Sequence, residues 1–423
     1  MLMLFRRFFA FGAIAILAAC GGSHGAQTAL PPTAATASSG NTASTFDIRK
    51  QAAEPTDVWV HYDYMVFPNG INYYCKTFPQ SGIPCFPPGF STAPDEQQIR
   101  RIVDAFRAQG LTLHIDPQHT AIPGRLVLVF DDGIGFYTFD PACTGGDAVG
   151  YEALKAKYFQ PHSNHPWHYA IFGFNDQFPD QTVLAACSSA IHVTVEGLRA
   201  YLGWSGSSPI PGYEFIVTLG GLYTEQFSNS FIAQETAVGF MHELGHNFGL
   251  QHGGSDGINY KPNYLSVMNY ADESKGGIPY AASQGSTQIA GFRLDYSERA
   301  LPTLDENHLN ENLGIQSGTT DISFYSVHDA PFSCGGTFAF VSVPTTGPID
   351  WNCDGTLESD VSVNLHSTPG DPQSNTQLVG FDDWSFIKQS LTVAPAAAPR
   401  AVPHVDTMPV HMSPRQFIRG VRR

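Results

Sequence analysis

The segment 242–252 constrains this chain more than any other, because it reads HELGHNFGLQH. On a helix, residues four positions apart lie one turn apart on the same face, so His242 and His246 can point two imidazole rings at a single ion. Gly249 has no side chain and readily takes the left-handed conformation that ends a helix. The chain can then bend, so that His252 supplies a third nitrogen. The segment therefore predicts a helix that ends near Gly249 and carries a three-histidine metal site.

Three imidazole ligands indicate zinc at a catalytic site. Structural zinc sites are usually closed by four protein ligands, whereas catalytic sites leave the fourth position to water. Glu243 lies beside the ligand face and can reach such a water without binding the metal itself. The alternative is a helix with solvent-facing histidines. That alternative would have to explain why the apolar residues leave the ligand face free, namely Val238, Phe240, Met241, Leu244 and Phe248.

The segment resembles the extended zinc motif of the metzincin clan of metallopeptidases, which also requires a methionine-containing turn downstream. Residues 265–270 read LSVMNY and place Met268 sixteen residues after His252. The resemblance implies that Met268 is a hydrophobic floor beneath the metal and not a ligand. It also implies that Tyr270 lies near the zinc, where it can bind the resting metal or donate to the developing oxyanion. A tyrosine of the hydrophobic core is the alternative for Tyr270.

The residues that follow His252 indicate which members of the metzincin clan the chain resembles most. His252 is followed by two glycines and not by the aspartate of matrixin-like or adamalysin-like members. The sequences 253–257 and 259–264 look closer to pappalysin-like and related bacterial secreted members. The specific motifs cover only about residues 236–270, and the rest of the chain matches the clan in element order alone.

The resemblance implies a zinc-dependent endopeptidase that acts on protein or peptide substrates. Bound zinc lowers the pKa of water and polarises the scissile carbonyl, while Glu243 accepts a proton and passes it to the leaving amine. By the same resemblance, substrate is expected along an edge strand at residues 215–220. Two other functions stay open: a surface-anchored zinc-containing binding module without proteolytic activity, and a non-peptidase zinc hydrolase. A monomer is expected.

Hydrophobic patterning predicts an α/β (α+β) fold with a mixed sheet backed by helices. The resemblance implies that this fold is a metzincin-like zincin domain with an active-site helix and an irregular C-terminal subdomain. Strands are expected at residues 58–62, 111–115, 126–130, 169–172 and 215–219. Helices are expected at residues 95–109, 151–159, about 228–250 and 383–391. Past residue 253 the pattern indicates mainly loops.

The first twenty residues predict export. Arg6 and Arg7 precede an apolar run, residues 8–19, that is too short to span a bilayer comfortably. The run ends in a Leu-Ala-Ala-Cys sequence at Cys20, which resembles a bacterial lipobox with a lipidated cysteine. By this resemblance the chain is anchored at the outer membrane or cell surface, and membrane contact is expected only through that lipid. An ordinary cleaved signal peptide would instead leave it periplasmic or extracellular.

Composition divides the chain into four parts. Residues 1–19 are the signal peptide, and residues 20–45 lack apolar periodicity, which is typical of a flexible tether. Residues 46–392 form the catalytic domain, and residues 393–423 are a Pro- and Ala-rich tail that is expected to be disordered. The net charge of −16 repels phosphate backbones, so nucleic acid is not expected as a partner.

Seven cysteines support export. Without Cys20 an even number remains, which in an oxidising compartment suggests three disulfides; free buried thiols are the alternative. Sequence alone allows fifteen connectivities, and pairing of nearest neighbours is expected because each pair closes a local segment. These pairs are Cys75–Cys85, Cys143–Cys187 and Cys334–Cys353.

Two weaker motifs remain. Oxygen ligands at alternate positions, Asp350, Asn352 and Asp354, precede a glycine and begin like a calcium loop, which Glu358 or Asp360 would complete. Val361 occupies the last ligand position of the usual pattern, so a solvated acidic turn stays open. His162, His165 and His168 are spaced by three, but nearby prolines disfavour a helix, and we interpret them as loop histidines.

Overall fold

The computed structural model describes residues 56–71, 85–130, 135–139, 149–174, 185, 206–218, 228–328, 338–367, 374–392 and 403–406. Of residues 126–130, 135–139, 327–328, 338–340 and 403–406 it describes the backbone. The signal peptide, the lipobox cysteine Cys20 and the tether all lie outside these ranges. The described residues belong to one unit, Ile48–Arg423.

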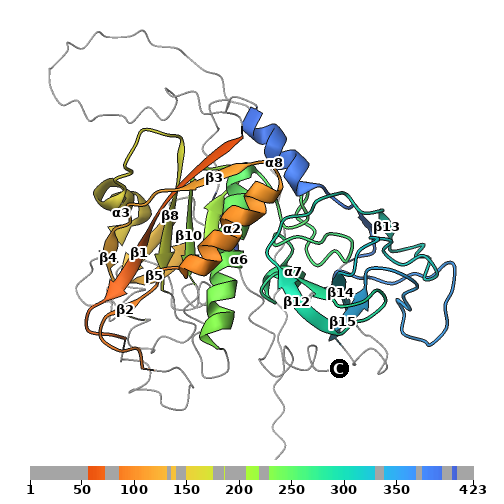
Figure 1. The fold of residues 1–423 in the computed structure, drawn as a ribbon. Coiled ribbons are helices and arrows are strands. Elements are labelled where there is room, and N and C mark those ends of the chain that lie inside the picture. Colours follow the sequence, from red (N-terminus) through yellow and green to blue (C-terminus); the bar gives the residue numbers. More distant parts are fainter. Residues whose placement is uncertain are drawn as a thin grey trace, which may run out of the picture. The chain divides into compact units, whose positions relative to one another are not determined.

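The centre of the fold is a mixed eight-stranded sheet (Figure 1). Its path runs β17 (Pro403–Asp406), β9 (Gly206–Pro209), β10 (Glu214–Thr218), β8 (Trp167–Gly173), β1 (Asp57–Phe67) and β2 (Phe90–Ser91). Strands β3 (Thr112–Ile115) and β4 (Ala121–Pro123) also pair with β1. Strands β1, β3, β4, β8 and β10 are parallel, whereas β2, β9 and β17 pair antiparallel. The predicted mixed sheet is confirmed.

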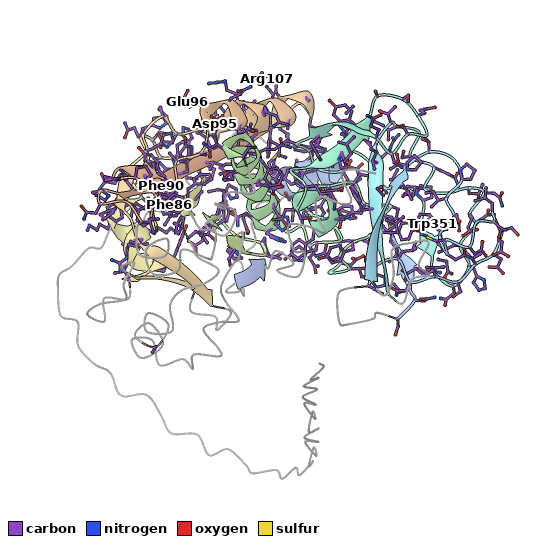
Figure 2. The ribbon with its side chains drawn as sticks, turned by 90° about the horizontal axis from the view of Figure 1, so that it is seen from below. Phe86, Phe90, Asp95, Glu96, Arg107 and Trp351 are labelled. Carbon is purple, nitrogen blue, oxygen red and sulfur yellow. The ribbon has the colours of Figure 1, made fainter. Side chains whose placement is uncertain are left out.

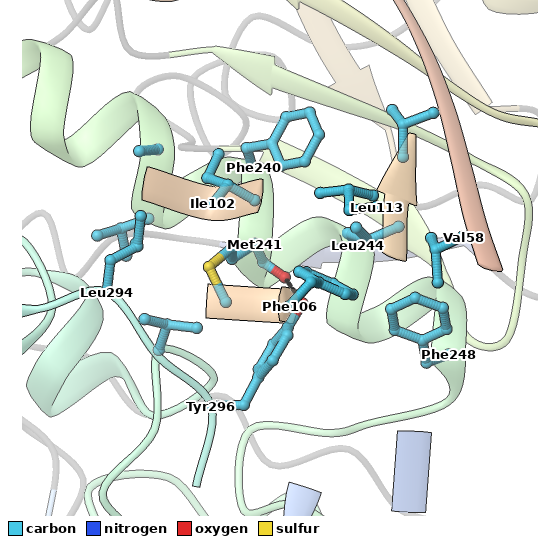
Figure 3. Packing of buried hydrophobic residues seen from close by; sticks show 14 of the residues in the cluster. Val58, Ile102, Phe106, Leu113, Phe240, Met241, Leu244, Phe248, Leu294 and Tyr296 are labelled. Carbon is cyan, nitrogen blue, oxygen red and sulfur yellow. Dashed lines mark hydrogen bonds between the residues drawn. The ribbon is translucent and has the colours of Figure 1, made fainter. Parts of the chain in front are cut away.

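Two helices cover one face of the sheet and a third covers the other. Helices α2 (Glu96–Ala108) and α6 (Asn229–Phe248) share a core with alternate residues of the strands, such as Val60 and Val217. Figure 3 shows Phe240, Met241 and Leu244 of α6 packed beside Ile102 and Phe106 of α2. The intervening strand residues, including Ile216, pack with α3 (Tyr151–Tyr158) on the opposite face. This alternation is the period of two that a strand buried on both faces requires.

Local signals fix where α2 begins and ends. The side chain of Asp95 accepts hydrogen bonds from the backbone N–H groups of Gln97 and Gln98, and Figure 2 labels this N-cap next to Glu96. At the other end Gly110 has a φ of 77°, which ends the helical conformation. The helix predicted over residues 95–109 is confirmed.

The part after α6 contains more strands than the sequence predicted. Three two-stranded sheets form there: β11 (Ile278–Ala281) with β12 (Ile289–Arg293), β13 (Leu304–Asp305) with β16 (Gln377–Leu378), and β14 (Ile322–His328) with β15 (Phe338–Pro344). They enclose a separate core that contains Trp351, which Figure 2 labels. Helices α7 (Tyr270–Glu273) and α8 (Asp383–Thr392) complete this part, and α8 confirms the predicted helix at 383–391.

The remaining strands are β5 (Leu126–Phe130), β6 (Gly135–Phe139) and β7 (Val149–Gly150), which form a three-stranded antiparallel sheet. Residues 403–406 lie in the segment that was expected to be disordered, and they form strand β17. Within the described part of the chain, no helix has the length and apolar character needed to cross a membrane.

Phe106 is expected to contribute strongly to stability, because it is fully buried between α2, α6 and α8. Its ring centroid lies 5.1 Å from that of Trp384 and 6.3 Å from that of Phe248. Phe106→Ala should lower the free energy of unfolding by about 3–5 kcal/mol. The exposed neighbour Arg107 (Figure 2) is the control, since Arg107→Ala should change it by only about 0.5 kcal/mol. Equal losses in urea denaturation would contradict this packing.

Candidate metal centre

Helix α6 carries two of the three histidines, and its ends follow from local chemistry. Ser228 caps the N-terminus by accepting the backbone N–H of Phe231 at 3.2 Å. The helix ends at Phe248, and Gly249 adopts the left-handed conformation with a φ of 105°. The N–H of Gly249 donates to the carbonyl oxygens of Gly245 and His246. The predicted helix end at Gly249 is confirmed.

The bend after Gly249 brings the third histidine to the other two. His242, His246 and His252 offer ligand nitrogens that all lie within 4.8 Å of one another. All three side chains are buried, and the ring centroid of His252 lies 5.3 Å from that of His242 and 5.1 Å from that of His246. Among the described residues this is the one group of histidine, cysteine or carboxylate side chains with metal-site spacing. The structure thus assembles the predicted triad.

Hydrogen bonds fix which nitrogen of each α6 histidine faces the centre. The Nδ1 of His242 lies 2.8 Å from the carbonyl oxygen of Val267, and the Nδ1 of His246 lies 2.7 Å from that of Leu250. A carbonyl oxygen can only accept, so in neutral imidazoles the proton is on Nδ1 and the lone pair is on Nε2. The two Nε2 atoms lie 3.0 Å apart. Two lone pairs at that distance repel each other unless a cation lies between them.

The spacing of these nitrogens fits zinc. Two nitrogens bound at about 2.0–2.1 Å in tetrahedral geometry lie about 3.3 Å apart, close to the observed separation of the two Nε2 atoms. Donation of Nδ1–H to a backbone carbonyl is also the arrangement that orients histidine ligands around metals. The residues present therefore fit the metal that the sequence predicted.

The methionine turn lies directly against the metal-site helix. Met268 is fully buried, and a Cβ placed on Gly245 would lie 2.4 Å from its sulfur atom. Only a residue without a side chain lets the turn approach α6 this closely. The hydroxyl of Ser266 accepts the backbone N–H of Met268 and donates to Asp383 at 2.6 Å. Met268 is thus buried against the helix that carries His242 and His246, and its role as a floor beneath the metal stays a prediction.

Tyr270 lies beside the histidine rings. Its ring centroid is 4.2 Å from that of His252 and 5.8 Å from that of His242. The side chain of Asn259 accepts the backbone N–H of Tyr270 at 2.9 Å, which holds this residue at the start of α7. The position near the metal that was inferred for Tyr270 agrees with this geometry.

Strand β9 runs along the side of α6 that carries Glu243. The Glu243 side chain is buried, and a Cβ on Gly206 would lie 2.0 Å from its Oε1 atom. The hydroxyl of Ser208 donates to the backbone oxygen of Glu243 at 3.0 Å. The side-chain amide of Asn247 donates to Ser208 and to the backbone oxygen of Glu214. These bonds hold β9 next to the carboxylate, and the sequence analysis had identified none of Gly206, Ser208 and Asn247.

Comparison with known families decides what this centre is. Residues 175–284, about a quarter of the 423-residue chain, match the family model described as gametolysin peptidase M11, a zinc metallopeptidase family of the metzincin clan. The protein is a zinc metallopeptidase. The match confirms the metzincin interpretation, but it points to gametolysin and gives no support to the pappalysin-like subgroup. No curated protein and no solved structure matches the chain.

A cluster of buried ionisable side chains lies next to His242 in the metallopeptidase. The carboxylate of Glu273 lies 3.6 Å from the Nδ1 of His242. Burial raises the pKa of Glu235 well above its usual range, and the charge of Glu273 adds to this shift. Burial lowers the pKa of Lys275, whose ammonium donates to the backbone oxygen of Ala271. Glu273 therefore lies where it can favour the Nδ1-protonated form of His242.

Lys261 supports the glycine-containing loop after His252. Its side chain is fully buried, and its ammonium donates to the backbone oxygens of Gly253 at 2.6 Å and Val379 at 2.8 Å. It also pairs with the carboxylate of Asp256 at 3.1 Å. The sequence analysis did not predict this role, because no motif marks Lys261.

The other predicted sites have different outcomes. The oxygens of Asp350 and Asp354 accept backbone N–H groups within the loop, and Asn352 donates to Asp354 and Glu358. Calcium binding there stays a prediction. Cys85 and Cys353 each take part in a disulfide. The pairing stays a prediction, because the other cysteines lie outside the described residues: Cys20, Cys75, Cys143, Cys187 and Cys334.

The three histidines at 162, 165 and 168 do not share a site. His162 lies 2.7 Å from Asp116, His165 stacks on Trp59, and His168 is buried in strand β8. The interpretation of His168 as a loop residue is wrong, because the strand begins at Trp167, directly after the proline.

Gly245→Ala tests the close approach of Met268. The new methyl group should displace the sulfur atom and weaken zinc binding by about tenfold to a hundredfold, although alanine favours a helix. Gly239→Ala on the same helix is the matched control, since its Cβ would meet only a Val217 methyl at 3.3 Å. Chelator competition measures both affinities. Unchanged binding in Gly245→Ala would contradict the proposed floor.

His168 should make the peptidase lose stability in acid. Burial lowers its pKa to about 4, below the 6.5 of an exposed histidine, while its bond to Asn247 opposes the shift. A depressed pKa gives stability that is present above pH 6.5 and lost as the pH falls toward 4, by about 3 kcal/mol. His168→Gln should remove this loss. Parallel stability–pH curves for the two proteins in urea unfolding would refute the prediction.

Proposed function

We propose that the metallopeptidase is a secreted endopeptidase in which His242, His246 and His252 bind zinc and Glu243 is the general base. The observation that carries this proposal is the pair of Nε2 atoms 3.0 Å apart, with both Nδ1 atoms committed to backbone carbonyls. A zinc ion at this position supplies Lewis acidity, which polarises a peptide carbonyl and makes water more acidic.

The surroundings of Glu243 support its proposed role in moving the proton. Its carboxylate is buried on the same helix as two of the histidines, and β9 passes beside it at Gly206. A carboxylate in this environment can accept a proton from the attacking water and donate it to the nitrogen of the leaving amine. The hydroxyl of Tyr270, whose ring packs on His252, can donate to the carbonyl oxygen as that oxygen gains negative charge.

The substrate is proposed to add to the sheet at β9. The sequence placed it along residues 215–220, but this interpretation is wrong, because β10 (Glu214–Thr218) lies between β8 and β9 and has no open edge. Strand β9 is bonded to α6 through Ser208 and approaches the Glu243 carboxylate at Gly206. The outer side of β9 is paired with β17, and an extended peptide that took the place of β17 there would lie next to the proposed general base.

A zinc-containing binding module without activity is the second candidate. Nothing in the site favours it, because metal binding alone does not require a buried carboxylate beside two ligands. A non-peptidase zinc hydrolase would cleave esters or amides and leave proteins intact. A broad protease assay on zinc-loaded protein separates these functions.

Export is part of the proposal and rests on the N-terminal sequence. The positive residues, the apolar run and Cys20 support a lipid anchor at the outer membrane or cell surface. Calcium binding at residues 350–358 and a monomeric state are proposed separately, and peptidase chemistry does not depend on either.

Glu243→Gln tests the catalytic assignment. Removing the base should lower kcat on a protein or peptide substrate by about 100-fold to 10,000-fold, while zinc stays bound. Glu235→Gln is a matched control on the same helix, because burial raises the pKa of Glu235 and so favours its neutral form, to which glutamine is similar in shape. Zinc content and kcat are measured for both. Retained activity in Glu243→Gln would refute the assigned role.

A further inference from the structure

The outer edge of β9 is already occupied by this chain. Strand β17 pairs antiparallel with β9 over its whole length, with Pro403 opposite Pro209 and Asp406 opposite Gly206. Among the described residues β17 is the last strand on this side of the sheet. A segment nearly 200 positions later in the sequence thus covers the edge that faces the proposed substrate site.

The register shows which backbone groups of β9 are used. Directly opposite residues in an antiparallel pair alternate between exchanging two hydrogen bonds and exchanging none. Pro403 and Pro209 both lack an N–H group, so their pair cannot exchange two. The bonded pairs are therefore His404 with Ser208 and Asp406 with Gly206, and the Val405–Ser207 pair is not bonded.

The two β9 residues that are bonded to β17, Gly206 and Ser208, both contact Glu243, the proposed general base. Ser208 donates its hydroxyl to the backbone oxygen of Glu243, and Gly206 lies against the carboxylate of the same residue. A peptide that adds to β9 beside Glu243 needs the N–H and carbonyl groups of these two residues. A second strand cannot use them at the same time, because each edge of a strand accepts one partner.

We propose that the C-terminal segment 403–406 is a strand that competes with the peptide substrate for the outer edge of β9. This inference rests on the proposed function, because it takes the substrate to bind at that edge. The segment holds the metallopeptidase in a state in which peptide must displace β17 before it can reach Glu243. Displacement raises the apparent KM and leaves kcat unchanged.

Two proline variants of the full-length, zinc-loaded protein test this competition. Asp406→Pro removes an N–H from a bonded position, whereas Val405→Pro removes one that points away from β9 and serves as the matched control. Loss of one backbone hydrogen bond weakens the pairing about fivefold. For a short internally quenched peptide, Asp406→Pro should therefore lower KM by up to about fivefold at constant kcat, and Val405→Pro should not.

Hydrogen exchange gives a readout that does not need activity. The amide hydrogens of Gly206 and Ser208 should exchange faster in Asp406→Pro than in Val405→Pro or the unaltered protein. Unaltered exchange together with an unchanged KM in Asp406→Pro would overturn the proposed competition. If no variant cleaves any peptide, the proposed function fails, whereas the exchange rates still decide whether 403–406 covers β9.

Discussion

The geometry of the metal centre depends on two hydrogen bonds between histidine side chains and backbone oxygens. The Nδ1 atoms of His242 and His246 donate to the backbone oxygens of Val267 and Leu250. Each bond joins the helix to a segment that follows it: Val267 belongs to the methionine turn, and Leu250 belongs to the bend after Gly249. The tautomers of the ligands are therefore set by the fold, and the fold requires the turn and the bend to be in place.

Contacts with distant segments also position the side of α6 that carries Glu243. Asn247 follows a histidine ligand in sequence, yet its side chain faces away from the metal and binds β9 and β10 through Ser208 and Glu214. Met268 can contact the helix only because position 245 is glycine. One helix thus presents two of the three histidines, the proposed general base and the anchor of a sheet edge. A shift of this helix would alter all three together.

Local patterns in the sequence predicted the elements on which the site is built. The spacing of His242, His246 and Gly249 was sufficient to predict the helix, its end and the bend, because each follows from backbone geometry over a few residues. The apolar alternation around Val60 and the apolar run around Val217 likewise predicted strands of the central sheet. Met268 was found because its turn has a recognisable sequence at a defined distance from the histidines.

The missed features depend on contacts between distant segments. The edge of the sheet was misassigned because strand order is not visible in the pattern of β10, and β9 reads Gly-Ser-Ser-Pro without apolar character. Lys261 and Asn247 act through buried backbone oxygens, which have no sequence signature. In contrast, β14 reads ISFYSVH and is rich in β-branched and aromatic residues, so this strand carried a usable signal.

Zinc-edge X-ray absorption of the purified metallopeptidase tests the central claim most directly, because it counts the ligands and identifies their atoms. The account predicts a zinc ion with three imidazole nitrogens at about 2.0–2.1 Å and one further light ligand. Sulfur at about 2.3 Å, only two imidazoles, or no bound zinc would contradict the proposal that His242, His246 and His252 form one metal site.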